Sequence, residues 1–215
     1  FKNFGITPLY LSSMRMVFSG LILTIASLLT NKENLISMLK DKRSVLELVL
    51  FALFGLLFNQ VSYLEAINNS NSGTATILQY IGPVFCMITE CILIKRLPTK
   101  KEVGAIILAM IGTFILATHG DIHRIYITPL GLMWGLFSAF AIVFYTFLPI
   151  RLIGKYGAIP VTGCAMLIGG AITSTCSRAF LQPFNTNPKF IMLLVLIILL
   201  GTIISYTLYL MGINR

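Results

Sequence analysis

Seven long apolar stretches run through the chain and constrain its fold more than any other feature. They cover residues 8–30, 45–67, 73–94, 102–118, 130–149, 160–180 and 190–212. An α-helix crosses a bilayer core about 30 Å thick with roughly 20 mostly apolar residues. Only 11% of the residues are charged and 57% are apolar, which exceeds what the core of a soluble domain needs. Continuous apolar runs such as 191–200 also lack the alternation of a membrane β-strand. The sequence therefore predicts an all-α polytopic membrane protein with seven spanning helices.

The charges, which sum to +9, fall between these stretches. Lysine and arginine gather in 31–44, 95–101 and 151–155, whereas the connections of opposite parity hold fewer cations. By the positive-inside rule the cation-rich connections are cytoplasmic. We therefore read the net charge as a topology signal of a multi-pass protein in a bacterial plasma (inner) membrane, and we expect no nucleic-acid partner.

Two pairs of segments resemble each other at nearly the same separation. Residues 5–8 match 157–160, which lie 152 positions later, with a methionine six positions after each. Residues 54–68 match 200–214, which lie 146 positions later, with Gly, Tyr, Leu, Ile and Asn coinciding. In both pairs the partners are five helices apart, an odd number, so the second copy enters the membrane from the opposite side. The sequence therefore predicts an inverted repeat.

The repeat defines the expected domains. The first repeat, 1–118, holds helices two to five of a five-helix unit. An inter-repeat loop at 119–129 leads to the second repeat, 130–215, which holds helices six to eight. The helix at 130–149 begins the second copy without a counterpart before residue 1. We therefore expect the chain to be seven helices of a ten-helix parent, with one further helix before it and two after it.

Four groups of residues form a pattern typical of one transporter family. They are Thr7-Pro8 with Arg15; 55–66; 75–85; and Arg96-Leu97-Pro98-Thr99 with Gly104 and Gly112. This pattern resembles the drug/metabolite transporter superfamily, specifically its EamA-type members. That family usually has a glutamate just before the Arg-Leu pair, where this chain has Lys95. The resemblance implies a ten-helix carrier with a central cavity between two five-helix halves. It also implies export or exchange of amino acids, other metabolites or toxic compounds.

Polar residues near the middle of the apolar stretches are the candidates for a substrate cavity, because inverted-repeat carriers bind substrate near the bilayer midplane. They are Arg15, Asn59, Gln60, Tyr63, Gln79, Tyr80, Pro83, Ser205, Tyr206 and Tyr209. The repeat matches Asn59, Gln60 and Tyr63 with Ser205, Tyr206 and Tyr209. The alternative is that these groups only join helices by hydrogen bonds.

Pro83 lies near the middle of its stretch, where it removes an amide donor and frees the carbonyl of Gln79. An unpaired carbonyl is costly in hydrocarbon, so it should face protein or water. Either Gln79 and Tyr80 line the cavity, or a neighbouring helix satisfies the kink.

Arg15 lies about seven residues inside its stretch, where an unpaired charge costs several kcal/mol. Three explanations stay open: it binds an anionic group of the substrate such as a carboxylate, it pairs with Glu65 or Glu90, or it snorkels to the interface. The same two glutamates could couple transport to protons if they are buried. Otherwise they are interfacial carboxylates in water.

The stretches hold few groups suited to catalysis, since they lack aspartate, a histidine pair and a serine with a credible base. We expect a secondary transporter that works by alternating access, with a channel or accessory subunit as the alternative and an enzyme as the remote one.

His119 and His123 lie just beyond a helix end, so we expect no metal site and no cofactor. The expected partners are a small-molecule substrate and lipid, while proton coupling and a homodimer stay open. Gly131, Gly135 and Ala139 recur every four residues and predict a helix-packing face.

Overall fold

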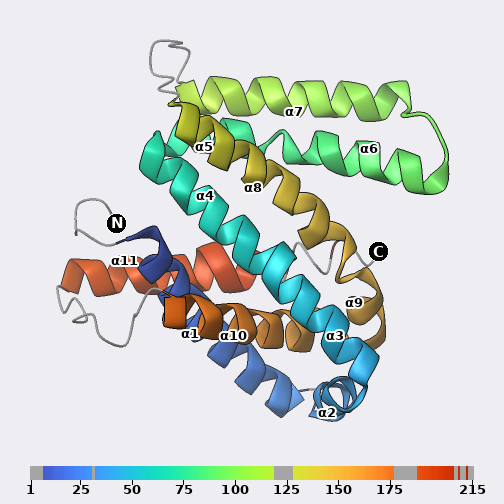
Figure 1. Ribbon diagram of the computed structural model, residues 1–215, viewed down its shortest axis with the longest axis vertical. Helices are drawn as coiled ribbons and strands as arrows, with labels where there is room; N and C mark the ends of the chain where they lie inside the picture. The colour runs from blue at the N-terminus through green and yellow to red at the C-terminus, as the bar shows by residue number, and fades with distance from the viewer. Residues whose placement is uncertain are drawn as a thin grey trace. The chain divides into compact units, whose positions relative to one another are not determined.

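Helices make up most of the part of the chain that the structure describes (Figure 1). The structure is a computed structural model and describes residues 7–30, 32–118, 128–176, 188–205, 208 and 212. The α-helices are α1 (Pro8–Thr30), α2 (Lys32–Lys40), α3 (Lys42–Leu50), α4 (Phe58–Asn69), α5 (Ser72–Gln79), α6 (Gly82–Ile94), α7 (Lys100–Thr118), α8 (Pro129–Phe147), α9 (Ile150–Tyr156), α10 (Ala158–Cys176) and α11 (Pro188–Ile198). Two π-helical segments, η2 (Phe51–Leu57) and η5 (Leu199–Ile204), continue α3 and α11. Within the described residues there is no strand, which confirms the all-α prediction.

Five helical runs within the described residues are long and apolar enough to cross a membrane. They are Leu9–Thr30, Lys42–Asn69, Ser72–Ile94, Pro129–Tyr156 and Ala158–Cys176. Helix α7 and the shorter apolar run Ile191–Ile204 occupy the other two expected stretches. Large apolar side chains such as Leu108 are exposed, by 72% in this case, which suits a lipid environment. These features confirm a polytopic membrane protein.

The helices form two compact units, each described here by itself. The first unit contains residues 1–57 and 146–215, and the second contains residues 58–145. Each unit draws residues from both expected repeats, because helix packing rather than sequence similarity defines a unit. The division into repeats at 1–118 and 130–215 therefore stays a prediction.

In the first unit, α1 packs against α10 through glycines that allow the two backbones to approach closely. A Cβ atom on Gly170 would lie 2.9 Å from the backbone N of Val17, and one on Gly163 would lie 2.9 Å from that of Thr24. In these contacts the residue number rises on α1 while it falls on α10, so the two helices are antiparallel. Figure 1 shows them side by side. Small residues are the usual means of packing helices tightly in membranes.

In the second unit, α8 presents the predicted small-residue face to its neighbours. A Cβ atom on Gly135 would lie 2.5 Å from Cδ1 of Leu78 on α5, and one on Gly131 would lie 3.1 Å from the backbone O of Asn69 at the end of α4. Ala139 is fully buried. These contacts confirm that the face packs helices together.

Candidate functional site

The helical run formed by α5 and α6 is broken near its middle. Helix α5 ends at Gln79, α6 begins at Gly82, and Pro83 occupies the first turn of α6. Because Pro83 has no amide hydrogen, it cannot donate to the carbonyl of Gln79. The amide of Val84 instead donates to Ile81 O at 3.0 Å, and a new helix starts there. Regular α-helix is therefore interrupted at Tyr80 and Ile81, where the sequence predicted an effect of Pro83.

Three polar side chains meet at this break, and we call them the amide cluster. Gln79 Nε2 donates to Ser138 Oγ at 2.9 Å and to Asn59 Oδ1 at 3.3 Å. Ser138 Oγ also donates to Asn59 Oδ1, at 3.4 Å. Asn59 and Ser138 are buried. The structure thus brings together two of the predicted cavity residues, Asn59 and Gln79, from different helices.

Ser138 is the member of the amide cluster that the sequence-based reasoning missed. A usable signal existed, because Ser138 lies at the midpoint of the helix Pro129–Phe147. Its hydroxyl is both a donor and an acceptor, which lets it join the two amides. The sequence-based reasoning interpreted α8 only as a packing helix, because of its small-residue face.

Gln60 follows Asn59 on α4 and is 3% exposed. Neither Oε1 nor Nε2 of Gln60 has a hydrogen-bond partner within the described residues. A buried polar group left unpaired costs about 1–3 kcal/mol. Gln60 is therefore the amide in this unit with capacity to bind an additional polar group.

The two tyrosines predicted for this region are placed differently. Tyr63 Oη lies 3.0 Å from Thr76 Oγ1, so it joins α4 to α5. Tyr80 lies in the break between α5 and α6 and is 43% exposed. Of the two, Tyr80 has the more accessible ring.

Arg15 contacts η5 in the first unit. Its Nε and Nη2 donate to Thr202 Oγ1 at 3.3 and 3.2 Å. Thr202 is fully buried and donates its own proton to Ile197 O at 3.0 Å. Its oxygen therefore directs its lone pairs toward the guanidinium. None of the three explanations drawn from the sequence named this neutral hydroxyl, because Thr202 is 187 residues away from Arg15.

The two glutamates considered as partners of Arg15 lie in the second unit, where each has a contact of its own. Glu65 Oε2 accepts from Asn69 Nδ2 at 3.4 Å. Glu90 Oε1 forms an ion pair with Arg96 Nη2 at 3.1 Å, and Arg96 also binds Glu102 at 2.7 Å. The hydrogen bonds that Arg96 donates to the carboxylates of Glu102 and Glu90 raise its pKa. A role of Glu65 or Glu90 in proton coupling stays a prediction.

The predicted residues of the second repeat are only partly described. Ser205 Oγ donates to Leu200 O at 2.7 Å and is exposed. Tyr206 and Tyr209 lie outside the described residues, as do His119 and His123. Among the residues that the structure describes, no group of three or more His, Cys, Asp or Glu side chains could hold a metal ion.

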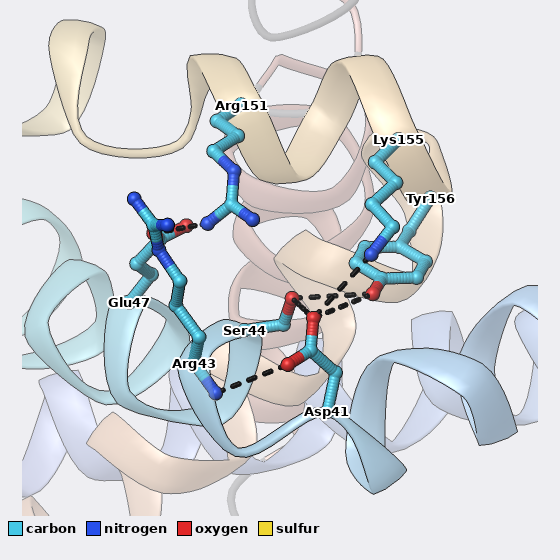
Figure 2. A network of polar contacts seen from close by, with 7 residues as sticks. All are labelled: Asp41, Arg43, Ser44, Glu47, Arg151, Lys155 and Tyr156. Atoms are coloured by element: carbon cyan, nitrogen blue, oxygen red, sulfur yellow. Dashed lines mark hydrogen bonds and ion pairs between the residues drawn. The ribbon is translucent and has the colours of Figure 1, made fainter.

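A further polar cluster joins α3 to α9 in the first unit (Figure 2). Its members are Asp41, Arg43, Ser44, Glu47, Arg151, Lys155 and Tyr156, and we call them the α3–α9 network. Arg151, Lys155 and Tyr156 reach from α9 toward the first turns of α3. The sequence-based reasoning used these cations for topology and missed their acidic partners.

The chain is similar in sequence to known membrane proteins. Residues 3–118 match the model of the EamA-like transporter family. The chain is also 34% identical, over 203 residues, to an uncharacterized inner membrane transporter, YicL, of Salmonella typhimurium. That match covers 94% of this chain and 67% of the relative. No solved structure matches the chain.

Proposed function

Because the chain belongs to the EamA-like transporter family and is a membrane transporter rather than an enzyme, we propose that it moves its substrate by alternating access. The proposed substrate is a small metabolite, an amino acid or a drug-like molecule, and the proposed direction is export or exchange. The proposed location is the inner membrane, which agrees with the printed name of the relative and with the positive-inside distribution of lysine and arginine.

The amide cluster at the break between α5 and α6 is the observation that carries this proposal. Broken helices at membrane depth are tolerated where they are buried in protein or line a water-filled space. Carriers use such breaks to expose backbone and side-chain groups to substrate. Gln79 and Asn59 supply amide groups there, and Gln60 lies beside them without a partner among the described residues. We propose that these three residues, with Tyr80 and Pro83, form part of the substrate site.

Inverted repeats are part of the proposal, and the packing of α1 against α10 supports them. The two helices are repeat partners at the offset of 152 residues, and they run antiparallel. At this offset Val17 is matched with Gly169, and the close approach of the two helices is between Val17 and Gly170. The helices therefore meet near equivalent points, as a two-fold axis would require.

The two π-helical segments give independent support for the repeat. Segment η2 contains Gly55 and η5 contains Gly201, and these glycines are matched at the offset of 146 residues. π-Helical turns are rare and are frequently found at functional sites. Their recurrence at matched positions favours two related halves, each with an irregular helix of the same kind.

Counterflow in vesicles would test the proposed transport. The full-length protein is reconstituted, loaded with an unlabelled solute from a panel of amino acids and drugs, and assayed for uptake of the labelled solute. A carrier accumulates label transiently, whereas a channel only equilibrates it. We expect Gln60→Leu and Gln79→Leu to reduce the exchange at least tenfold, because each removes an amide from the proposed site. Thr113→Val is the control, because its hydroxyl bonds only to Ala109 O of its own helix.

Two results would contradict the proposal. Equilibration of every solute without counterflow would identify a channel. Normal exchange by Gln60→Leu and Gln79→Leu, with the same yield of folded protein as Thr113→Val, would place the substrate site elsewhere.

A further inference from the structure

Contacts in the α3–α9 network bridge segments more than one hundred residues apart (Figure 2). Arg151 Nη1 donates to Glu47 Oε1. Lys155 Nζ donates to Asp41 Oδ2 at 3.3 Å, and Ser44 Oγ lies 3.1 Å from Tyr156 Oη. These pairs are separated by 104, 114 and 112 residues. The network is therefore a tertiary joint and not a local feature of one helix.

Asp41 organises one half of this joint. It caps the N-terminus of α3, since Arg43 N donates to its Oδ1 at 3.2 Å. Its Oδ2 accepts from Ser44 Oγ at 2.7 Å and from Tyr156 Oη at 3.4 Å, besides Lys155. One carboxylate thus fixes the start of α3 and holds α9 against it.

Glu47 organises the other half and lies six residues after Asp41, on α3. Its Oε1 accepts from Arg43 Nε at 3.2 Å on its own helix and from Arg151 on α9. Its side chain is 24% exposed and that of Arg151 is 45% exposed. Water-exposed ion pairs are individually weak, so this half can open and close at little energetic cost.

Burial distinguishes the inner edge of the network from its ion pairs. Ser44 is fully buried and Tyr156 is 4% exposed, so their hydroxyl contact is shielded from water. Asn34 on α2 adds a bond from its Nδ2 to Tyr156 O at 3.3 Å. The joint therefore has a closed inner layer beneath an outer layer of ion pairs.

The place of the joint in the chain suggests what it does. Helices α2 and α3 belong to the expected first repeat, and α9 belongs to the second. The segments 31–44 and 151–155 are both on the cation-rich, cytoplasmic side. In an alternating-access carrier, contacts between the two repeats on one side of the membrane must separate when that side opens. We propose that the α3–α9 network is the cytoplasmic gate of this carrier, an assignment that rests on the proposed alternating-access function.

This assignment predicts that the charges at Glu47 and Arg151 affect the side of the membrane to which the carrier is open. Arg151→Glu places two carboxylates together and should favour the state that is open to the cytoplasm. The double variant Glu47→Arg with Arg151→Glu exchanges the two charges and should restore the balance. Lys42→Glu is the matched control, because it makes the same charge change at an exposed position on the first turn of α3, outside the network.

Sidedness can be read from the alkylation of a cysteine in the amide cluster. Ser138→Cys is introduced after the four native cysteines, Cys86, Cys91, Cys164 and Cys176, have been replaced by alanine. A membrane-impermeant maleimide is then added from the cytoplasmic or the outer side of oriented vesicles. We expect Arg151→Glu to raise the rate of cytoplasmic alkylation about fivefold, the order that one exposed ion pair supplies. The double variant should return the rate to within about twofold of the parent.

The outcomes separate this inference from the proposed function. Absence of counterflow in the parent would overturn the carrier itself. Counterflow in the parent, with equal rates of alkylation in Arg151→Glu and Lys42→Glu, would show that the network only stabilises the fold. That result would contradict its assignment as a gate. If Arg151→Glu does not fold, Arg151→Gln decides by the same measurement, because it removes the ion pair without adding a like charge.

Discussion

Gly163 offers a quantitative test of the packing between α1 and α10. A Cβ atom at this position would lie 2.9 Å from the backbone N of Thr24, 2.9 Å from Thr24 Oγ1 and 3.1 Å from the backbone C of Leu23. Two of these three atoms belong to the backbone, so a rotamer change cannot relieve the clash. Gly163→Ala must therefore push α1 and α10 apart by a few tenths of an ångström, and overpacking of this kind typically costs about 1–3 kcal/mol.

The control for this substitution is Gly104→Ala on α7. A Cβ atom on Gly104 would have no neighbour within 4 Å among the described residues. Both substitutions gain the same helix propensity, up to about 1 kcal/mol, when alanine replaces glycine. That gain cancels in the comparison. The difference in the free energy of unfolding between the two variants should therefore isolate the overpacking, at about 1–3 kcal/mol.

Unfolding of the full-length protein by SDS in mixed micelles, followed by circular dichroism, would measure this difference. Gly163→Ala should unfold at a lower SDS fraction than the parent, and Gly104→Ala at the same or a higher fraction. Equal stability of the two variants would refute the close backbone contact between α1 and α10. It would also remove the support that this contact gives to the inverted repeat.

Four further predictions concern the site and the network. Thr202→Val should destabilise the protein by about 1.5–3 kcal/mol, because the charged guanidinium of Arg15 loses one hydrogen-bond acceptor; unfolding in SDS measures this. If Arg15 binds an anionic substrate group, Arg15→Lys should raise the KM for exchange, since lysine lacks the bidentate fork; an unchanged KM would exclude that role. Pro83→Ala should slow exchange more than it changes the Tm, because a restored amide donor would close the helix break. The hydrogen bond from Ser44 is the main cause that lowers the pKa of Asp41 to about 2. Because this pKa is below its value in the unfolded chain, Asp41 stabilises the fold above about pH 4 and loses this effect as the pH falls toward 2. Melting curves should show a smaller loss of stability at acid pH for Asp41→Asn than for the parent, because Glu102, whose pKa is also lowered to about 2, contributes to the loss in both.

Local features of the sequence were enough to predict the helices and some of their contacts. The apolar stretches 45–67 and 160–180 appear as the helical runs Lys42–Asn69 and Ala158–Cys176. Pro83 predicted the break beside Gln79 because the loss of one amide donor acts within a single helical turn. The packing face of Gly131, Gly135 and Ala139 was also visible, since a spacing of four places side chains on one side of a helix.

The pairing of polar groups was not visible in the same way. The guanidinium of Arg15 donates to Thr202, which is 187 residues away, and none of the explanations drawn from the sequence named that hydroxyl. Ser138 joins Asn59 across 79 residues, and Arg151 joins Glu47 across 104. No periodicity relates such pairs, so only the folded chain could identify them.

The sequence by itself therefore determined where the chain forms apolar helices and where one of them is interrupted, and it predicts which connections face the cytoplasm. The physical reason is that the bilayer acts on each stretch of about 20 residues separately, through hydrophobic length and flanking charge. The tertiary structure decided which polar groups meet. A buried donor or acceptor must find a partner after the helices have packed, and such partners meet between α1 and η5, among α4, α5 and α8, and between α3 and α9.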